Sequence, residues 1–248
     1  AQFKAVPSFA LKSKGIVMTN VQNPSAWAQS TPQCFADLAF ADEYTKQDLF
    51  DYVQYPQLCG NIILEGAYGS GKSTIAAIIA EERLGNTASV YELNGAAWSD
   101  DTLSTLRGTF NLAHSCGDIP VVIINEVDRL KEQQYKLRDF LDEYTQRLLV
   151  IMTTNHLGNI DGSILDRSDV FRVRGFEPLQ AVGVAQPVLK RFRVKVTDSD
   201  LMAIFERNLI ADETELSLRK IGRVVDRLVL QLGTPQPHTT QKPTLTVV

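Results

Sequence analysis

The chain has 248 residues, 44% hydrophobic and 22% charged, which is typical of a soluble globular protein with one large domain or a domain and a smaller one. A formal net charge of −4 excludes a generally basic surface, so nucleic acid could meet only a local patch. With no apolar run of membrane-spanning length, no visible signal peptide and three cysteines without metal-type spacing (Cys34, Cys59 and Cys116), we expect no membrane partner and a reducing, cytoplasmic location, or a nuclear one in a eukaryote.

The N-terminal part has no strong pattern before residue 35. Residues 1–34 mix lysines with scattered apolar residues and are predicted to form an arm, which either packs on the protein or contacts a partner or DNA through its lysines. A helix is then expected to begin near Asp42 and to end at Pro56, because proline cannot continue a helix.

The most specific pattern lies at residues 66–74, between a predicted strand at 61–65 and a predicted helix that ends at Leu84. These residues fit G-x-x-x-x-G-K-[ST], in which glycines let successive N–H groups point at phosphate oxygens and the following helix adds the positive end of its dipole. Lys72 would add a charge for the β- and γ-phosphates, and the Ser73 hydroxyl would be a ligand of Mg²⁺. The predicted phosphate-binding residues are Gly66, Tyr68, Gly69, Ser70, Gly71, Lys72, Ser73 and Thr74.

Strands and helices alternate up to residue 174. Strands are predicted at residues 89–93, 119–124, 148–153 and 171–174, and helices at 101–115 and 131–144. The β-branched apolar run at 119–124 is typical of a strand buried on both faces. The alternation predicts an α/β layer fold with a mostly parallel sheet.

The ends of two buried strands carry the candidate catalytic residues, because ligands of such sheets bind at the carboxyl edge. Glu126 is the candidate for deprotonating an attacking water and Asp128 for reaching the water shell of a metal, although a solvated helix start is the alternative for both. Asn125 stands where an aspartate usually helps to hold Mg²⁺, so the metal site has one charge fewer and we expect slow hydrolysis. Asn155 would bond the γ-phosphate or position water.

After Pro178 the pattern becomes helical. Helices are predicted at about 198–209 and 216–232, and residues 192–196 are compatible with a short extended segment. We therefore predict a small helical domain at 178–232 and, because prolines, threonines and glutamines follow, a flexible tail at 233–248.

Five motifs, taken in order, resemble those of the AAA+ ATPases. Residues 66–74 are similar to Walker A, 123–128 to Walker B, 153–155 to sensor 1, Arg167 to the arginine finger and Arg219 to sensor 2. The resemblance covers about residues 35–232. Within the superfamily it points most to clamp-loader small subunits and related DNA-replication ATPases, on the segments 92–94, 125–130 and 141–144, although their Ser-Arg-Cys finger motif appears here as Asp-Arg-Ser at 166–168.

The resemblance implies a P-loop fold and an oligomer. A parallel five-stranded sheet sandwiched by helices would form a nucleotide-binding domain at 35–177, followed by an all-helical lid domain. ATP and Mg²⁺ would lie between them in a ring or arc of like or unlike AAA+ subunits. Arg167 would act on the neighbour's ATP and Arg219 on that of its own chain, with ion pairs on the surface as the alternative for both. The implied catalytic residues are Glu126, Asn155 and Arg167, and the implied metal site contains Ser73, Asn125 and Asp128.

Three functions are compatible with these motifs. The first is an ATPase acting on DNA, with Arg107, Arg129 and Lys131 as candidate phosphate contacts or, alternatively, solvated surface charges. The second is a remodeller or switch acting on protein partners, for which Trp98 would be a pore-loop aromatic unless it lies in the core. The third is a structural subunit that binds ATP and hydrolyses it weakly, as Asn125 suggests.

Overall fold

The computed structural model describes residues 25–85, 90–115, 119–210 and 213–233. Most of the predicted arm and nearly all of the predicted tail lie outside these ranges. Within them, no helix is long and apolar enough to cross a membrane.

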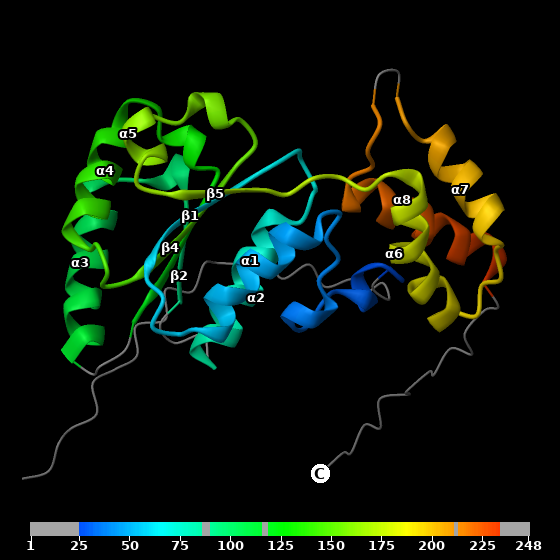
Figure 1. Cartoon of the computed structure of the whole chain (residues 1–248), viewed down its shortest axis with the longest axis horizontal. Coiled ribbons are helices and arrows are strands. Elements are labelled where there is room, and N and C mark those ends of the chain that lie inside the picture. The colour runs from blue at the N-terminus through cyan, green and yellow to red at the C-terminus, as the bar shows by residue number, and fades with distance from the viewer. Residues whose placement is uncertain (1–24, 86–89, 116–118, 211–212, 234–248) are drawn as a thin grey trace, which may run out of the picture.

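Five strands form one parallel sheet in the order β2-β3-β4-β1-β5 (Figure 1). The strands are β1 (Gly60–Glu65), β2 (Val90–Asn94), β3 (Val121–Asn125), β4 (Leu149–Thr154) and β5 (Asp169–Arg172). The register pairs Glu65 with Thr154 and Asn94 with Asn125, so the carboxyl ends meet at one edge. The predicted five-stranded parallel sheet is therefore confirmed.

Helices cover both faces of the sheet, and each face has its own apolar core. On one face lie α1 (Glu43–Gln54) and α2 (Lys72–Leu84), which pack on alternate strand residues such as Ile62 and Ile123. On the other lie α3 (Asp100–Ser115), α4 (Gln134–Glu143) and α5 (Gly162–Leu165), which pack on Ile63 and Ile124 (Figure 1). This alternation follows from the period of two in a strand. Short 3₁₀ helices occur at Ala28–Ser30, Phe35–Asp37, Gly95–Ala97, Val127–Gln133 and Leu157–Asn159.

Three further helices, which we call the helical group, pack around a third core: α6 (Pro178–Arg191), α7 (Asp198–Arg207) and α8 (Leu218–Leu232). Leu189, Phe205 and Val225 are fully buried within it. Figure 1 shows this group to one side of the sheet and its covering helices. Backbone hydrogen bonds in both directions between Phe176 and Leu216 bring the start of α8 back to the end of the sheet domain.

The structure differs from the predictions at several places. The sequence interpretation missed α6, and residues 192–196 form no strand because Phe192 caps that helix. Strand β5 begins two residues before the predicted position. Helix α4 begins only at Gln134, because Lys131 has φ 49° and ψ −117°, which no helix accepts.

Candidate functional site

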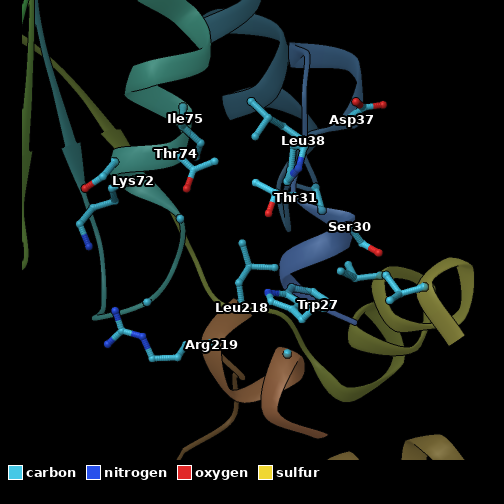
Figure 2. A pocket seen from close by; sticks show the side chains of 18 of the residues that line it. Trp27, Ser30, Thr31, Asp37, Leu38, Lys72, Thr74, Ile75, Leu218 and Arg219 are labelled. Carbon is cyan, nitrogen blue, oxygen red and sulfur yellow. The ribbon is translucent and has the colours of Figure 1, made fainter. Parts of the chain in front are cut away.

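A cavity of about 1180 Å³ lies between the carboxyl edge of the sheet and the helical group. Four parts of the chain line it: residues 27–39, the phosphate loop (residues 66–71) with the first turn of α2, the carboxyl ends of β3 and β4, and one side of α6 and α8 (Figure 2). The predicted site residues that line it are Tyr68, Gly69, Gly71, Lys72, Ser73, Thr74, Glu126, Asn155 and Arg219.

The phosphate loop holds the ammonium group of Lys72 at the base of the cavity. Nζ donates to the carbonyls of Gly66 (2.8 Å) and Ala67 (2.9 Å) and to Oδ1 of Asn155 (2.9 Å), and it lies 3.5 Å from Oγ of the buried Ser70. Lys72 is only 7% exposed, and this burial lowers its pKa, against the pull of the carboxylates of Glu65 and Asp128. A cation that has lost most of its water is well placed to receive a phosphate anion.

The residues next to the loop could hold Mg²⁺ together with a phosphate. Ser73 Oγ donates to Asn125 Oδ1 at 2.8 Å, and the Asp128 carboxylate accepts from Thr154 Oγ1 at 3.0 Å. The described residues contain no cluster of three or more acidic, histidine or cysteine side chains that would hold a metal alone. This donor set fits Mg²⁺, which keeps several waters and takes few protein ligands beside the phosphates of its substrate.

Glu126 follows β3 in an unusual backbone conformation, with φ 56° and ψ 50°. Its amide donates to Thr153 Oγ1 at 3.1 Å, which fixes the turn to the neighbouring strand. Its carboxylate pairs with Arg129 Nε at 3.0 Å and accepts from Asn94 Nδ2 at 3.3 Å. The candidate base therefore lines the cavity while held by two donors at its rim.

The first turn of α8 contacts the phosphate loop directly. The amide of Arg219 donates to the carbonyl of Gly69 at 3.2 Å, and Leu218 lies against Gly71. Figure 2 shows the Arg219 side chain reaching the loop, on the side opposite Trp27 and Leu218. Arg219 thus brings a positive charge from the helical group to the loop.

Five predicted site residues do not line the cavity: Gly66, Ser70, Asn125, Asp128 and Arg167. Gly66 and Ser70 contact Lys72 and Asn125 contacts Ser73, whereas the partners of Arg167 lie elsewhere. The guanidinium of Arg167 donates from Nε and Nη2 to the carboxylate of Asp142 (2.6 and 3.3 Å) and from Nη1 to the carbonyl of Ser163 (2.8 Å). The hydrogen bond to Asp142 raises the pKa of Arg167 and lowers that of Asp142. The ion pair that was the alternative interpretation of Arg167 is therefore present.

Sequence reasoning missed the part of the cavity wall that comes from residues 27–39 and α6. The amide of Trp27 donates to Asp226 Oδ1 at 2.9 Å, and Arg191 Nη1 donates to the carbonyl of Gln29 at 3.0 Å. The residues of α6 that line the cavity are Gly183, Val184, Pro187, Val188 and Arg191. Their spacing places them on one face of the helix, and this spacing is the sequence pattern that could have indicated their shared place in the wall.

Two of the three candidate DNA residues have partners within the chain, Lys131 is exposed, and the pore-loop candidate lies in the core. Arg107 pairs with Glu143 at 2.7 Å, and Arg129 pairs with Glu126. Trp98 is 4% exposed and packs edge-on against Phe140, so it is a core tryptophan.

Comparison with known families agrees with this fold. The model of the "ATPase family associated with various cellular activities (AAA)" matches residues 62–176, from β1 to the end of the sheet domain. Residues 62–176 therefore match an AAA ATPase domain.

Two solved structures share the fold. The AAA domain of FIGL-1 in complex with ADP is 20% identical, with a TM-score of 0.51, and the match covers 71% of this chain and 67% of that one. A variant of RuvB from Thermotoga maritima is 17% identical, with a TM-score of 0.58, and the match covers 80% and 64%. At these identities the likeness extends to the fold alone.

Curated relatives are similar over most of the chain but are longer proteins. A mitochondrial Lon protease homolog of Phaeodactylum tricornutum is 25% identical over 81% of this chain and 27% of its own length. Replication factor C subunit 5 of Arabidopsis thaliana is 25% identical over 70% of this chain and 48% of its own length. The chain thus spans about a quarter and about half of these two relatives.

Proposed function

We propose that the chain binds ATP with Mg²⁺ in the cavity and hydrolyses it. The observation that carries the proposal is the convergence of Lys72, Ser73, Glu126, Asn155 and Arg219, from separate segments, on one cavity. Phosphoryl transfer depends on positioning and on positive charge around the phosphate oxygens, and this set provides both.

Each residue has a role that its geometry supports. The loop amides, Lys72 and Arg219 bind the phosphates, with Tyr68, Ser70 and Thr74 shaping the loop. Ser73, Asn125 and Asp128 face the metal, whose charge would stabilise the transferred phosphoryl group. Glu126 deprotonates water, and Asn155 orients the γ-phosphate.

The two parts of the chain have different roles in binding the nucleotide. Residues 35–177 bind the phosphates, while residues 178–232 act as a lid whose α6 face presents Val184, Pro187 and Val188 to the base and sugar. Apolar walls with a few placed polar groups are the usual form of a nucleotide pocket.

Binding of a fluorescent ATP analogue and release of phosphate test this proposal. Lys72→Ala should abolish binding, because the phosphates lose the buried ammonium that is held against the loop. Glu126→Gln should bind normally but lose about 10²-fold or more in hydrolysis, as expected for a general base. Lys195→Ala, which removes an exposed lysine far from the loop in sequence, is the matched control and should behave as wild type. Unchanged binding by Lys72→Ala would refute the proposal.

We further propose that the chain works in a ring or arc of AAA+ subunits on DNA, in the manner of a clamp loader. The motif resemblance and the similarity to Replication factor C subunit 5 support this. Primed DNA should stimulate ATP hydrolysis, whereas a protein remodeller would bind its partner in an ATP-dependent way without a response to DNA. If DNA neither stimulates hydrolysis nor retains the protein at low salt, the DNA part is wrong.

A further inference from the structure

Glu92 lies beside the proposed metal site although no motif assigns it a role. It is on β2, whose residue 92 pairs with Ile123 of β3, and Ile123 packs on the face covered by α2. Paired residues of parallel strands project to the same face, so Glu92 and Asn125 share that face with Ser73 at the start of α2. Asn125 Nδ2 donates to Glu92 Oε1 at 2.7 Å.

This hydrogen bond determines which end of the Asn125 amide faces Ser73. An ionised carboxylate only accepts hydrogen bonds, so Glu92 must receive the amide nitrogen. The oxygen is then directed to the other side, where it accepts from Ser73 Oγ (2.8 Å) and from Thr153 Oγ1 (3.1 Å). Without Glu92 the two hydroxyls could satisfy either end of the amide, because a hydroxyl both donates and accepts.

Through the same contact, Glu92 supplies a negative charge next to residue 125, where Asn125 itself has none. Asn125 is neutral, but the carboxylate of Glu92 lies one hydrogen bond away from it. A pair of an amide and a carboxylate carries the same total charge as an aspartate beside a neutral residue. In this chain the negative charge is therefore on residue 92 instead of residue 125.

We infer that Glu92 is a positioning residue for Mg²⁺: it orients the Asn125 amide oxygen toward the metal side and supplies the negative charge that residue 125 lacks. This rests on the proposed ATP–Mg²⁺ function and adds a residue to it. Hydrogen-bond partners one step behind a metal-facing group affect metal affinity in this way.

The inference predicts that the effect of removing Glu92 depends on the residue at 125. Glu92→Gln keeps the shape but loses both the charge and the fixed acceptor. In the wild-type background it should weaken binding of a fluorescent ATP analogue about tenfold in Mg²⁺ and leave binding in EDTA unchanged. In the Asn125→Asp background it should cost nothing, because the charge is then at residue 125 and no amide needs orienting.

Four proteins (wild type, the two single variants and the double variant) are titrated with the analogue in Mg²⁺ and in EDTA, and thermal unfolding checks that each is folded. Glu81→Gln, which removes an exposed carboxylate from α2, is the control for loss of charge alone. An equal loss in both backgrounds, a loss in EDTA as well, or no loss at all would overturn the role of Glu92. If wild-type binding itself shows no Mg²⁺ dependence, the proposed ATP–Mg²⁺ function fails first and the inference fails with it.

Discussion

At the scale of single residues, the proposed binding of phosphate in the cavity depends on the environment of Lys72. Burial lowers the pKa of this lysine from its usual 10.5, and its ammonium donates hydrogen bonds to two loop carbonyls. Phosphate charges close to it favour the ammonium form, so the pKa should rise again when nucleotide binds.

We therefore predict that ATP affinity falls at alkaline pH. The bound state has the higher pKa, so binding is at full strength below the pKa of the free protein and weakens as the pH rises through it toward 10.5. Titration of a fluorescent ATP analogue between about pH 7 and about pH 10 measures this, with circular dichroism to confirm that the fold persists. A constant affinity over that range would contradict a lowered pKa of Lys72 in the free protein.

The sequence predicts many of the residues that line the cavity, because the phosphate loop and the residues after each strand are local patterns. It cannot predict partners that are distant in the chain. Asp142 is 25 residues from Arg167, and Asp226 is 199 residues from Trp27. No periodicity links such pairs, because they meet only when separate elements pack.

At the scale of elements, the contact between α8 and the phosphate loop couples the helical group to the ligand site. Gly69 makes it possible, since it has φ 77° and a Cβ there would lie 2.8 Å from Cβ of Arg219. Gly85 also has a left-handed φ, of 65°, but nothing lies within 4 Å of where its Cβ would be. The two glycines share backbone geometry and differ in what surrounds them.

Gly69→Ala should therefore weaken both stability and nucleotide binding, whereas Gly85→Ala should affect stability alone. Both pay about 1–2 kcal/mol for alanine in the left-handed region. Gly69→Ala should cost a further ~1–3 kcal/mol from overpacking and should displace the first turn of α8. Urea unfolding and analogue binding separate the two effects. If Gly85→Ala reduces binding as much as Gly69→Ala does, the contact is not what matters.

The elements themselves were predictable where one pattern dominates. Apolar runs predict β1, β3 and β4. Asp42 predicts the start of α1, and its side chain accepts hydrogen bonds from amides in the first turn of that helix. Helix α6 was missed because Pro187 lies inside it, and a proline within a run is a signal against a helix. In the structure, Pro178 in the first turn and a capping box between Glu177 and Gln180 nonetheless stabilise the start of α6.

At the scale of the whole molecule, Arg167 lies outside its own cavity and is held there by Asp142. If it serves a neighbouring subunit, Lys72→Ala and Arg167→Ala should each abolish hydrolysis alone, yet restore it when the two proteins are mixed. In the mixture an intact phosphate loop can meet an intact arginine from the other variant. Random pairing across a head-to-tail interface predicts roughly a quarter of wild-type activity.

Phosphate release from the mixture, with the oligomeric mass measured in ATP and Mg²⁺, checks this prediction. Asp142→Asn is the control, because it frees the guanidinium without removing it and should retain activity. A mixture no more active than its two components would place Arg167 outside the reaction. Loss of nucleotide binding in Arg167→Ala would also contradict a role toward the neighbour.

The third apolar core, around Leu189, Phe205 and Val225, shares none of its buried members with the cores on the two faces of the sheet. The sheet domain and the helical group have separate cores with a large cavity between them and can melt one after the other, so the protein without nucleotide should unfold in two steps. A nucleotide bound in that cavity touches both parts and should add about 2.7 kcal/mol at a hundredfold excess over its Kd. The two steps should then merge into one.

The chain contains its own optical probes for this behaviour, because Trp27 packs on the helical group and Trp98 lies in the core of the sheet. Urea melts of Trp27→Phe and Trp98→Phe, followed by tryptophan fluorescence, report the two parts separately. Their midpoints should differ without ATP and coincide with it, so that the nucleotide converts two independently melting units into one cooperative unit.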